Sequence, residues 1–346
     1  MTVSRAMSNT ETAPPELTCR DDPGVVVDPT RPDVEILTAR DVPLGGPRAM
    51  RVRRTLPQRQ RSLIGAWCFA DHYGPEDVAV AGGMDVGPHP HTGLQTVSWL
   101  FSGEVEHRDS LGSHALIRPG EVNLMTGGHG ICHSEVSTPD TRTLHGVQLW
   151  VALPDAHRHT GREFQHYAPG TVDLGNATAR VFLGSLAGDT SPVRTFTPLL
   201  GAELVLDPHT RLDLDVDPTF EHGVLVDLGT VAVAGTDLAS RDLGYVGTGV
   251  SALELANTGD APARVLLLGG TPFEEEIVMW WNFVGRTHEE IAEFRAAWQA
   301  ESDQFGRVEG YQGNPGRLPA PPLPKARLTP RHNPSPRAAR DEERPR

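Results

Sequence analysis

The 346-residue sequence has few cysteines, and their arrangement does not suit a small disulfide-bonded fold. Cys19, Cys68 and Cys132 are three in number, and no two of them have C-x-x-C spacing. An odd count without paired spacing argues against a disulfide framework and agrees with a reducing compartment. The N-terminal residues also lack the apolar stretch of a secretory signal. We therefore expect a cytoplasmic protein.

Long apolar runs and excess basic charge are missing as well. No run reaches the roughly 18 apolar residues that a membrane-spanning helix needs. The formal net charge is −14, and because residues 306–346 carry +5, the rest of the chain carries −19. Phosphate contacts need a basic surface, so we expect neither direct nucleic-acid binding nor a membrane partner. An acidic body fits a protein partner better.

Glycine and proline, by contrast, are abundant, with 36 and 30 residues respectively. They punctuate short apolar runs such as LQTVSWLF, LHGVQLWVAL, AELVLD and ARVLLLGG. Runs of this length at this spacing are typical of β-sandwiches and barrels, and no helical pattern lies between them. Two series of such runs, at about 35–155 and 165–275, predict an all-β chain with two similar barrels of the jelly-roll type.

The ends of the chain differ from this pattern. Residues 1–32 are polar and aperiodic, and residues 306–346 are rich in proline and arginine. We predict both to be disordered, since neither has an apolar pattern that could form a core. The predicted division is thus a disordered segment 1–32, a metal-binding barrel 33–160, a second barrel with a terminal helix 161–305, and a disordered tail 306–346.

One helix is predicted, in the stretch RTHEEIAEFRAAWQ. Thr287 is a suitable N-cap, and Glu290 three residues later completes a capping box. Ile291, Phe294 and Trp298 then share one face at helical spacing. We expect this face to pack on the outside of a barrel and assign it no cofactor role.

Histidine is concentrated in the first half of the chain, where eleven of the fifteen lie between residues 72 and 166. His89 and His91 form one pair, and His133 and Glu135 form a second pair with the same spacing of two. Side chains two apart on a strand point to the same face, so two such strands could bring four ligands together. Three imidazoles and a carboxylate suit a divalent first-row transition ion. An octahedral ion would keep two further positions, enough for a bidentate substrate or for a substrate together with dioxygen.

A single H-x-H pair could equally lie on a solvated strand face, and only its combination with H-x-E favours a metal site. Of the remaining histidines, His107, His114 and His129 are candidates to orient the ligands or line a pocket. Cys132 should point away from His133 and is expected to be a small buried residue. Four others are expected on the surface or in ordinary packing: His145, His157, His159 and His166.

Three stretches carry a resemblance to a known family. GPHPHTGLQTVSWLFSGEVEHRDSLGS and RPGEVNLMTGGHGICHSE resemble the N-terminal signature of pirins, members of the cupin superfamily. PFEEEIVMWWNFVGRTHEEI resembles the C-terminal Trp-Trp-Asn segment and the helix that follows it in that family. The similarity covers about residues 35–305. It implies two tandem cupin-type β-barrels (a bicupin) with a single iron in the first.

The resemblance places the metal ligands on His89, His91, His133 and Glu135, and implies Fe(II) as the cofactor. Gln95 stands where many cupins and pirins have glutamate, which leaves Glu135 as the carboxylate ligand. The second barrel has no paired ligands and is expected to be structural.

Some pirins resemble quercetin 2,3-dioxygenases, which implies a small aromatic, flavonol-like substrate and O₂. Glu135 would then accept the proton of the substrate's enol hydroxyl and is the predicted catalytic residue. The alternative is a non-catalytic, metal-dependent regulatory module that binds a protein partner as a transcriptional or metabolic cofactor. A zinc hydrolase fits less well, because four protein ligands would close a tetrahedral site.

Overall fold

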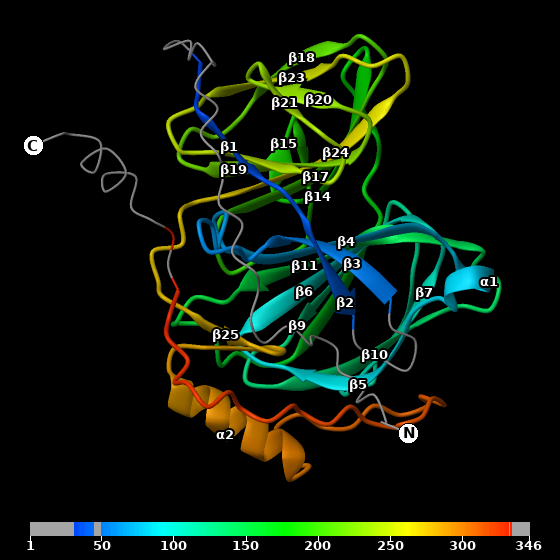
Figure 1. Cartoon of the computed structure of the whole chain (residues 1–346), viewed down its shortest axis with the longest axis vertical. Helices are drawn as coiled ribbons and strands as arrows, with labels where there is room; N and C mark the ends of the chain where they lie inside the picture. The colour runs from blue at the N-terminus through cyan, green and yellow to red at the C-terminus, as the bar shows by residue number, and fades with distance from the viewer. Residues whose placement is uncertain (1–30, 45–49, 332, 334–346) are drawn as a thin grey trace, which may run out of the picture.

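The computed structural model describes residues 31–44, 50–331 and 333 and is dominated by β-strands (Figure 1). Two helices occur in these residues, α1 (Val78–Ala81) and α2 (His288–Gln299). The strands form two barrels that pack against each other through their larger sheets, one above the other in Figure 1, so the prediction of an all-β chain with two tandem barrels is confirmed. Neither helix has the length and apolar character needed to cross a membrane.

The first barrel consists of a seven-stranded sheet facing a four-stranded sheet. In spatial order the larger sheet contains β12 (Glu163–Tyr167), β9 (Val122–Thr126), β6 (Leu94–Ser102), β11 (Thr143–Ala152), β4 (Trp67–Asp77), β3 (Met50–Leu56) and β2 (Arg40–Leu44). The smaller contains β5 (Asp85–His91), β10 (Ile131–Ser137), β7 (Val105–Asp109) and β8 (His114–Ile117).

The second barrel repeats this plan. Its larger sheet contains β1 (Val34–Leu37), β22 (Leu243–Val246), β19 (Glu221–Leu228), β24 (Ala263–Gly270), β17 (Leu199–Leu206), β14 (Ala177–Leu183) and β13 (Val172–Asp173). Its smaller sheet contains β18 (Arg211–Asp215), β23 (Ala252–Asn257), β20 (Val231–Val233) and β21 (Thr236–Leu238). Two short hairpins lie outside the barrels: β15 (Ser185–Leu186) with β16 (Asp189–Thr190), and β25 (Val278–Trp280) with β26 (Phe283–Gly285).

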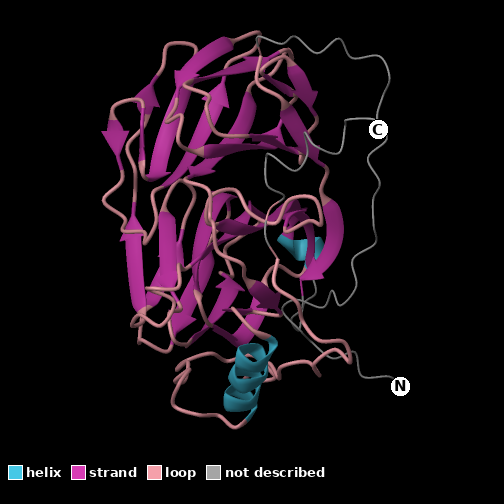
Figure 2. Ribbon diagram, turned by 90° about the vertical axis from the view of Figure 1, so that its left-hand side faces the viewer, coloured by secondary structure: helices cyan, strands magenta, loops and turns pink. Residues whose placement is uncertain are grey.

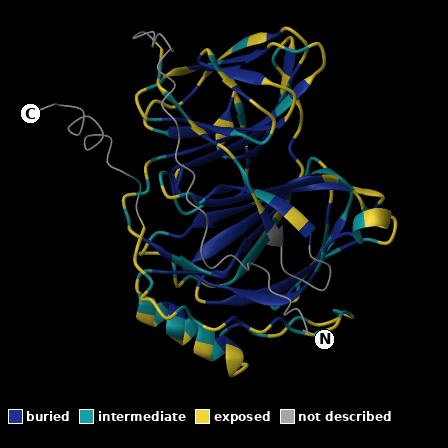
Figure 3. Ribbon diagram, in the orientation of Figure 1, coloured by how far each residue is buried: buried dark blue, intermediate teal, exposed yellow. Residues whose placement is uncertain are grey.

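The two larger sheets pack against each other and form one apolar core between the barrels (Figures 2 and 3). Trp99 of the first barrel stacks on Phe182 of the second with ring centroids 4.7 Å apart, and its Nε1 donates to Glu203 at 2.8 Å. Trp67 is fully buried and its Nε1 lies 3.2 Å and 3.1 Å from the carbonyls of Leu200 and Gly269. Each indole N–H therefore has a partner, as burial requires.

The predicted division at residue 160 differs from the observed one because the barrels exchange strands. β1 pairs with β22 of the second barrel although it precedes the first, and β12 pairs with β9 of the first although it follows residue 160. Helix α2 lies with β25 and β26 against the first barrel, where Phe283 bridges to Thr92. Each barrel therefore includes one strand that the predicted boundary assigns to the other barrel, β12 in the first and β1 in the second.

Helix α2 has the predicted cap, with Thr287 accepting from Glu290 N and Glu290 accepting from the backbone of Thr287. The predicted face is also confirmed, since Ile291 and Trp298 are buried and Phe294 packs beside them.

The expectation of disorder from residue 306 onwards is wrong for residues 306–331. This segment has no helix and only an isolated bridge at Arg331, yet it runs along the first barrel and α2 (Figure 1). Leu318 is fully buried, its carbonyl accepts from Trp298 Nε1 at 2.9 Å, and its N–H donates to Pro88. Such single contacts leave no periodic pattern in the sequence. The predictions for residues 1–30, 332 and 334–346 fall outside the described residues.

Candidate metal centre

Three neighbouring strands of the smaller sheet in the first barrel position the predicted ligands. β5 pairs with β10 so that His89 lies directly opposite His133, and a register shift follows between His133 and Glu135. On its other side β10 pairs with β7, where His133 lies opposite Asp109 and Glu135 opposite His107. Alternation along the strands directs these side chains to the barrel interior, as the spacing of two predicts.

The three histidines converge on one point. Nitrogen atoms of His89, His91 and His133 lie within 4.8 Å of one another, and all three residues are buried. Their ring centroids are 4.4–5.0 Å apart. His91 Nε2 and His133 Nε2 are separated by 3.0 Å. The structure therefore brings together the three histidines that the sequence pattern selected.

Burial keeps these imidazoles neutral. It lowers the pKa of His89 to about 4 and, with the neighbouring histidines, lowers the pKa of His91 and His133 well below the usual value. Neutral imidazole is the form that binds a metal ion. His89 Nδ1 lies 2.9 Å from the carbonyl of Gly87, which can only accept, so His89 Nε2 keeps its lone pair.

Glu135 lies beside this group rather than inside it. Its carboxylate forms a group within 4.8 Å with His133 and His107, and among the described residues no such group joins it to His89 or His91. Ser98 donates toward Glu135 Oε1 at 3.3 Å and lies 2.9 Å from Gln148 Oε1. Burial raises the pKa of Glu135, against the opposing effect of His107 and Ser98. No cationic side chain in the described residues is paired with this carboxylate.

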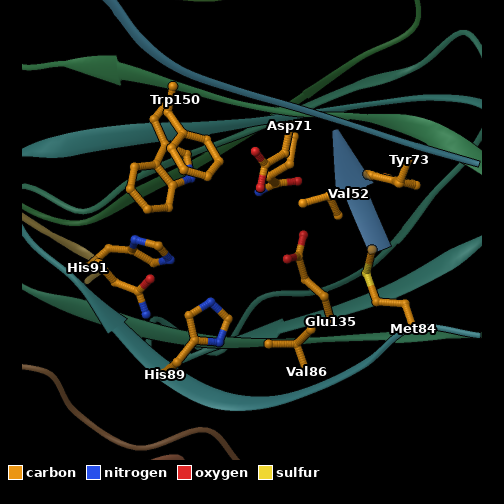
Figure 4. Close-up of a pocket in the computed structure, with 12 residues that line it drawn as sticks. Val52, Asp71, Tyr73, Met84, Val86, His89, His91, Glu135 and Trp150 are labelled. Atoms are coloured by element: carbon orange, nitrogen blue, oxygen red, sulfur yellow. The ribbon is translucent and has the colours of Figure 1, made fainter. Parts of the chain in front are cut away.

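A cavity of about 490 Å³, including its open mouth, adjoins the histidines (Figure 4). His89, His91 and Glu135 line one side, and Trp150 and Asp71 lie across from them. The wall is mainly apolar; the lining residues are Val52, Phe69, Asp71, Tyr73, Met84, Val86, His89, His91, Glu135, Gln148, Trp150 and Asn282. Phe69 lies between Trp150, which stacks on it at 4.0 Å, and the Arg54 guanidinium at 4.3 Å, so the aromatic part of the wall is held rigidly in place.

The residues present fit a divalent cation. His89, His91 and Glu135 line one buried cavity, and behind it His133 Nε2 faces His91 Nε2 at 3.0 Å, so three neutral nitrogen donors converge beside a carboxylate. A cation between them would bind both lone pairs. With Glu135 ionised, a divalent ion would leave a net charge of about +1 in the site, a small charge for a buried centre.

Six further histidines can be compared with the positions expected from the sequence. His107 contacts both His133 and Asp109, as expected for a residue that orients a ligand. His114 and His129 are exposed and do not line the cavity, so neither has the pocket role that we considered. His157, His159 and His166 lie at or near the surface, as expected. Cys132 is buried and lies 3.5 Å from the carbonyl of Gly306.

A second histidine group lies between the barrels, and no sequence pattern predicts it. His72 Nε2 and His145 Nε2 each lie 2.6 Å from the same oxygen of Asp227, while Arg264 donates to the other oxygen at 2.6 Å. Burial opposes ionisation of Asp227, but hydrogen bonds from His145 and His72 and the charge of Arg264 hold its pKa well below the usual range. His145 is therefore a buried interface residue. Asp227 is 155 residues from His72, so no local pattern connects them.

Two family models match the chain, one for each barrel. The model described as Pirin matches residues 49–151, and that of the Pirin C-terminal cupin domain matches residues 201–305. The "Putative quercetin 2,3-dioxygenase" of Pseudomonas aeruginosa is 48% identical over 290 residues, covering 83% of this chain and 90% of the relative. A pirin-like protein of Caulobacter vibrioides is 34% identical, covering 77% of this chain and 92% of the relative.

Solved structures agree with these matches. A crystal structure of quercetin 2,3-dioxygenase from Acinetobacter baumannii is 41% identical, covers 86% of this chain and 98% of its own chain, and has a TM-score of 0.79. A second quercetin 2,3-dioxygenase structure from the same organism is 25% identical, with coverage of 79% and 97% and a TM-score of 0.70. Both barrels and their arrangement are therefore shared with these proteins.

Proposed function

Because the chain belongs to the pirin family, a group of bicupin proteins, we propose that it is a metal-dependent dioxygenase of the quercetin 2,3-dioxygenase type. The observation that carries the proposal is the buried group of three neutral histidines opening onto an aromatic-walled cavity with Glu135. The ligands would be His89, His91, His133 and Glu135, and the ion Fe(II). A relative named "Putative quercetin 2,3-dioxygenase" at 48% identity and a solved quercetin 2,3-dioxygenase structure at 41% identity support this assignment.

The bound ion would supply Lewis acidity toward a substrate oxygen and a centre for reaction with dioxygen. The chain's own residues would do the rest. Trp150, backed by the stacked ring of Phe69, offers apolar aromatic surface to a substrate ring, which places a flavonol-like substrate beside the histidines. Burial of the cavity keeps bulk water away from the reacting atoms.

Glu135 would act as the base, which requires that it partly leave the metal ion. Its raised pKa and its place on the cavity wall suit a carboxylate that accepts the proton of an enol hydroxyl at Oε1 or Oε2. Ser98 has one hydroxyl proton to donate to Glu135 Oε1, and it would do so with the amide of Gln148 turned so that its NH₂ group donates to Ser98 Oγ.

The test joins metal analysis to turnover. Purified protein loaded anaerobically with Fe(II) should consume quercetin and O₂ together, followed by absorbance and an oxygen electrode. Glu135→Gln should lower kcat by about 10²–10⁴-fold if the carboxylate is the base. Iron bound at His89, His91 and His133 with no loss of quercetin would overturn the enzyme proposal. It would favour the alternative, a metal-dependent module that binds a protein partner, for which the acidic body of the chain is suited.

A further inference from the structure

Asp109 has all the hydrogen-bonding marks of an ionised carboxylate. Its Oδ1 accepts from the backbone N–H groups of Leu111 and Ser113, each at 2.9 Å, and its Oδ2 lies 3.1 Å from His107 Nε2. Burial opposes ionisation, but the hydrogen bonds from His107 and Ser113 hold the pKa of Asp109 below its usual value. An ionised carboxylate only accepts hydrogen bonds, so the proton between Asp109 and His107 belongs to His107 Nε2.

The protonation of His107 Nε2 has a consequence at the other ring nitrogen. A neutral imidazole with its proton on Nε2 can only accept at Nδ1. His107 Nδ1 lies 3.4 Å from His133 Nδ1, so the donor in this contact is His133. Phe164 packs on His107 with ring centroids 4.8 Å apart, which keeps the His107 ring in place.

With its proton on Nδ1, His133 has a free lone pair on Nε2. This is the atom that lies 3.0 Å from His91 Nε2 and faces the proposed ion. We propose that Asp109 and His107 are positioning residues that set the tautomer of His133, so that its Nε2 is ready to bind the metal. The proposal rests on the metal centre described above and extends the usual carboxylate–histidine–metal arrangement by one additional histidine.

Asp109→Asn should reverse this chain of hydrogen bonds. The backbone N–H groups of Leu111 and Ser113 would hold the amide oxygen of the asparagine, so its NH₂ group would face His107 Nε2. His107 would then carry its proton on Nδ1 and donate to His133 Nδ1, which moves the proton of His133 to Nε2. Because partners of this kind tune metal affinity, we expect the Kd for Co²⁺ to rise by about 10–100-fold.

His107→Phe provides the matched control. It removes the contact to His133 Nδ1 without imposing the wrong tautomer, so Co²⁺ should bind less tightly than to wild type but more tightly than to Asp109→Asn. The double variant Asp109→Asn/His107→Phe should bind Co²⁺ as His107→Phe does, because the asparagine then has no histidine through which to act. A double variant as weak as Asp109→Asn would show a merely structural effect and overturn the proposal.

A second measurement does not depend on metal binding. Long-range ¹⁵N–¹H NMR of metal-free, ¹⁵N-histidine-labelled protein reports the protonated nitrogen of each ring, with His133 assigned by its loss in His133→Gln. We expect His133 Nε2 to be unprotonated in wild type and protonated in Asp109→Asn; the same tautomer in both would contradict the relay. Failure of wild type to bind Co²⁺ would instead contradict the metal centre, while the NMR result would still decide the relay.

Discussion

Two of the buried groups of three potential ligands in the described residues, one in the first barrel and one at its border, differ in what they could hold. His89, His91 and His133 turn nitrogen lone pairs toward one another beside Glu135, which has no cationic partner in the described residues. His72 and His145 instead share one oxygen of Asp227, whose other oxygen is bound by Arg264.

The difference lies in charge and in satisfied hydrogen bonds. A divalent ion placed with the first group and Glu135 leaves about one positive charge, whereas beside Asp227 and Arg264 it would leave about two in a buried interface. In the second group, His72 Nε2 and His145 Nε2 are both already hydrogen-bonded to Asp227 Oδ1, each at 2.6 Å. A cluster of histidines therefore suits a metal ion only when the ring nitrogens that face its centre carry lone pairs, and not protons already donated to a carboxylate. The second group instead ties the barrels together.

The largest expected contrast between the two groups is in metal content. His133→Ala should reduce bound iron from about one per chain to less than about a tenth of that value, because a ligand is lost. His145→Ala should keep its iron, since His145 contacts Asp227 and lies outside the cavity. Elemental analysis of protein purified under the same conditions measures both. Equal iron loss in the two variants would show that the two histidine groups do not differ in metal binding.

The second contrast is in stability. Asp227→Asn should lower the free energy of unfolding by about 3–5 kcal/mol, because it leaves Arg264 and two histidines without their buried carboxylate. Its iron content should stay that of wild type. Urea denaturation followed by tryptophan fluorescence measures the first quantity and elemental analysis the second. A variant as stable as wild type would show that the interface does not depend on this network.

The third contrast is in pH dependence of the metal-free protein. The pKa of His89 is lowered to about 4 in the fold, against an ordinary value of 6.5. Between these pH values His89 binds a proton in the unfolded chain but not in the folded chain. The free energy of unfolding therefore falls as the pH drops from 6.5 toward 4. The slope is about 1.4 kcal/mol per pH unit for each proton. His89→Gln should reduce this slope by up to about one proton; an unchanged slope would contradict the assignment.

Asp227 behaves in the opposite way. Its pKa is lowered as a carboxylate, so its stabilising effect is fully present above the unfolded value and is lost only as the pH falls below it. The pH range from 6.5 to 4 therefore leaves the Asp227 carboxylate ionised. Because burial also lowers the pKa of His72 and His222, the contribution of His89 is taken from the difference between wild type and His89→Gln.

The smallest effect is expected at Ser98. In the described residues, Ser98 is the one side chain that offers Glu135 a hydrogen bond. Asp227, by comparison, has hydrogen bonds from Arg264 and from two imidazoles. Ser98→Ala should weaken Co²⁺ binding less than about tenfold, corresponding to the roughly 1 kcal/mol of a single hydrogen bond. Isothermal titration of the metal-free protein measures the change. A loss of Co²⁺ affinity as large as that in His133→Ala would show that Ser98 contributes far more to metal binding than a single hydrogen bond does.

How much the sequence predicts depends on whether the signal is local. The pairs His89/His91 and His133/Glu135 were identifiable because spacing of two places side chains on one strand face, and the cap at Thr287 because it spans four residues. The exchange of β1 and β12 was not identifiable, since antiparallel pairing between distant strands leaves no periodic mark. The same holds for Asp227 and for the single contacts of Leu318.

The strand exchange has a consequence for how the chain unfolds. A chain cut between residues 160 and 161 would separate β12 from β9 and β1 from β22, leaving bare hydrogen-bonding edges on both halves. The shared apolar layer around Trp67 and Trp99 would also be opened. The two barrels should therefore melt as one cooperative unit, with a single calorimetric transition, although each has the topology of an independent domain.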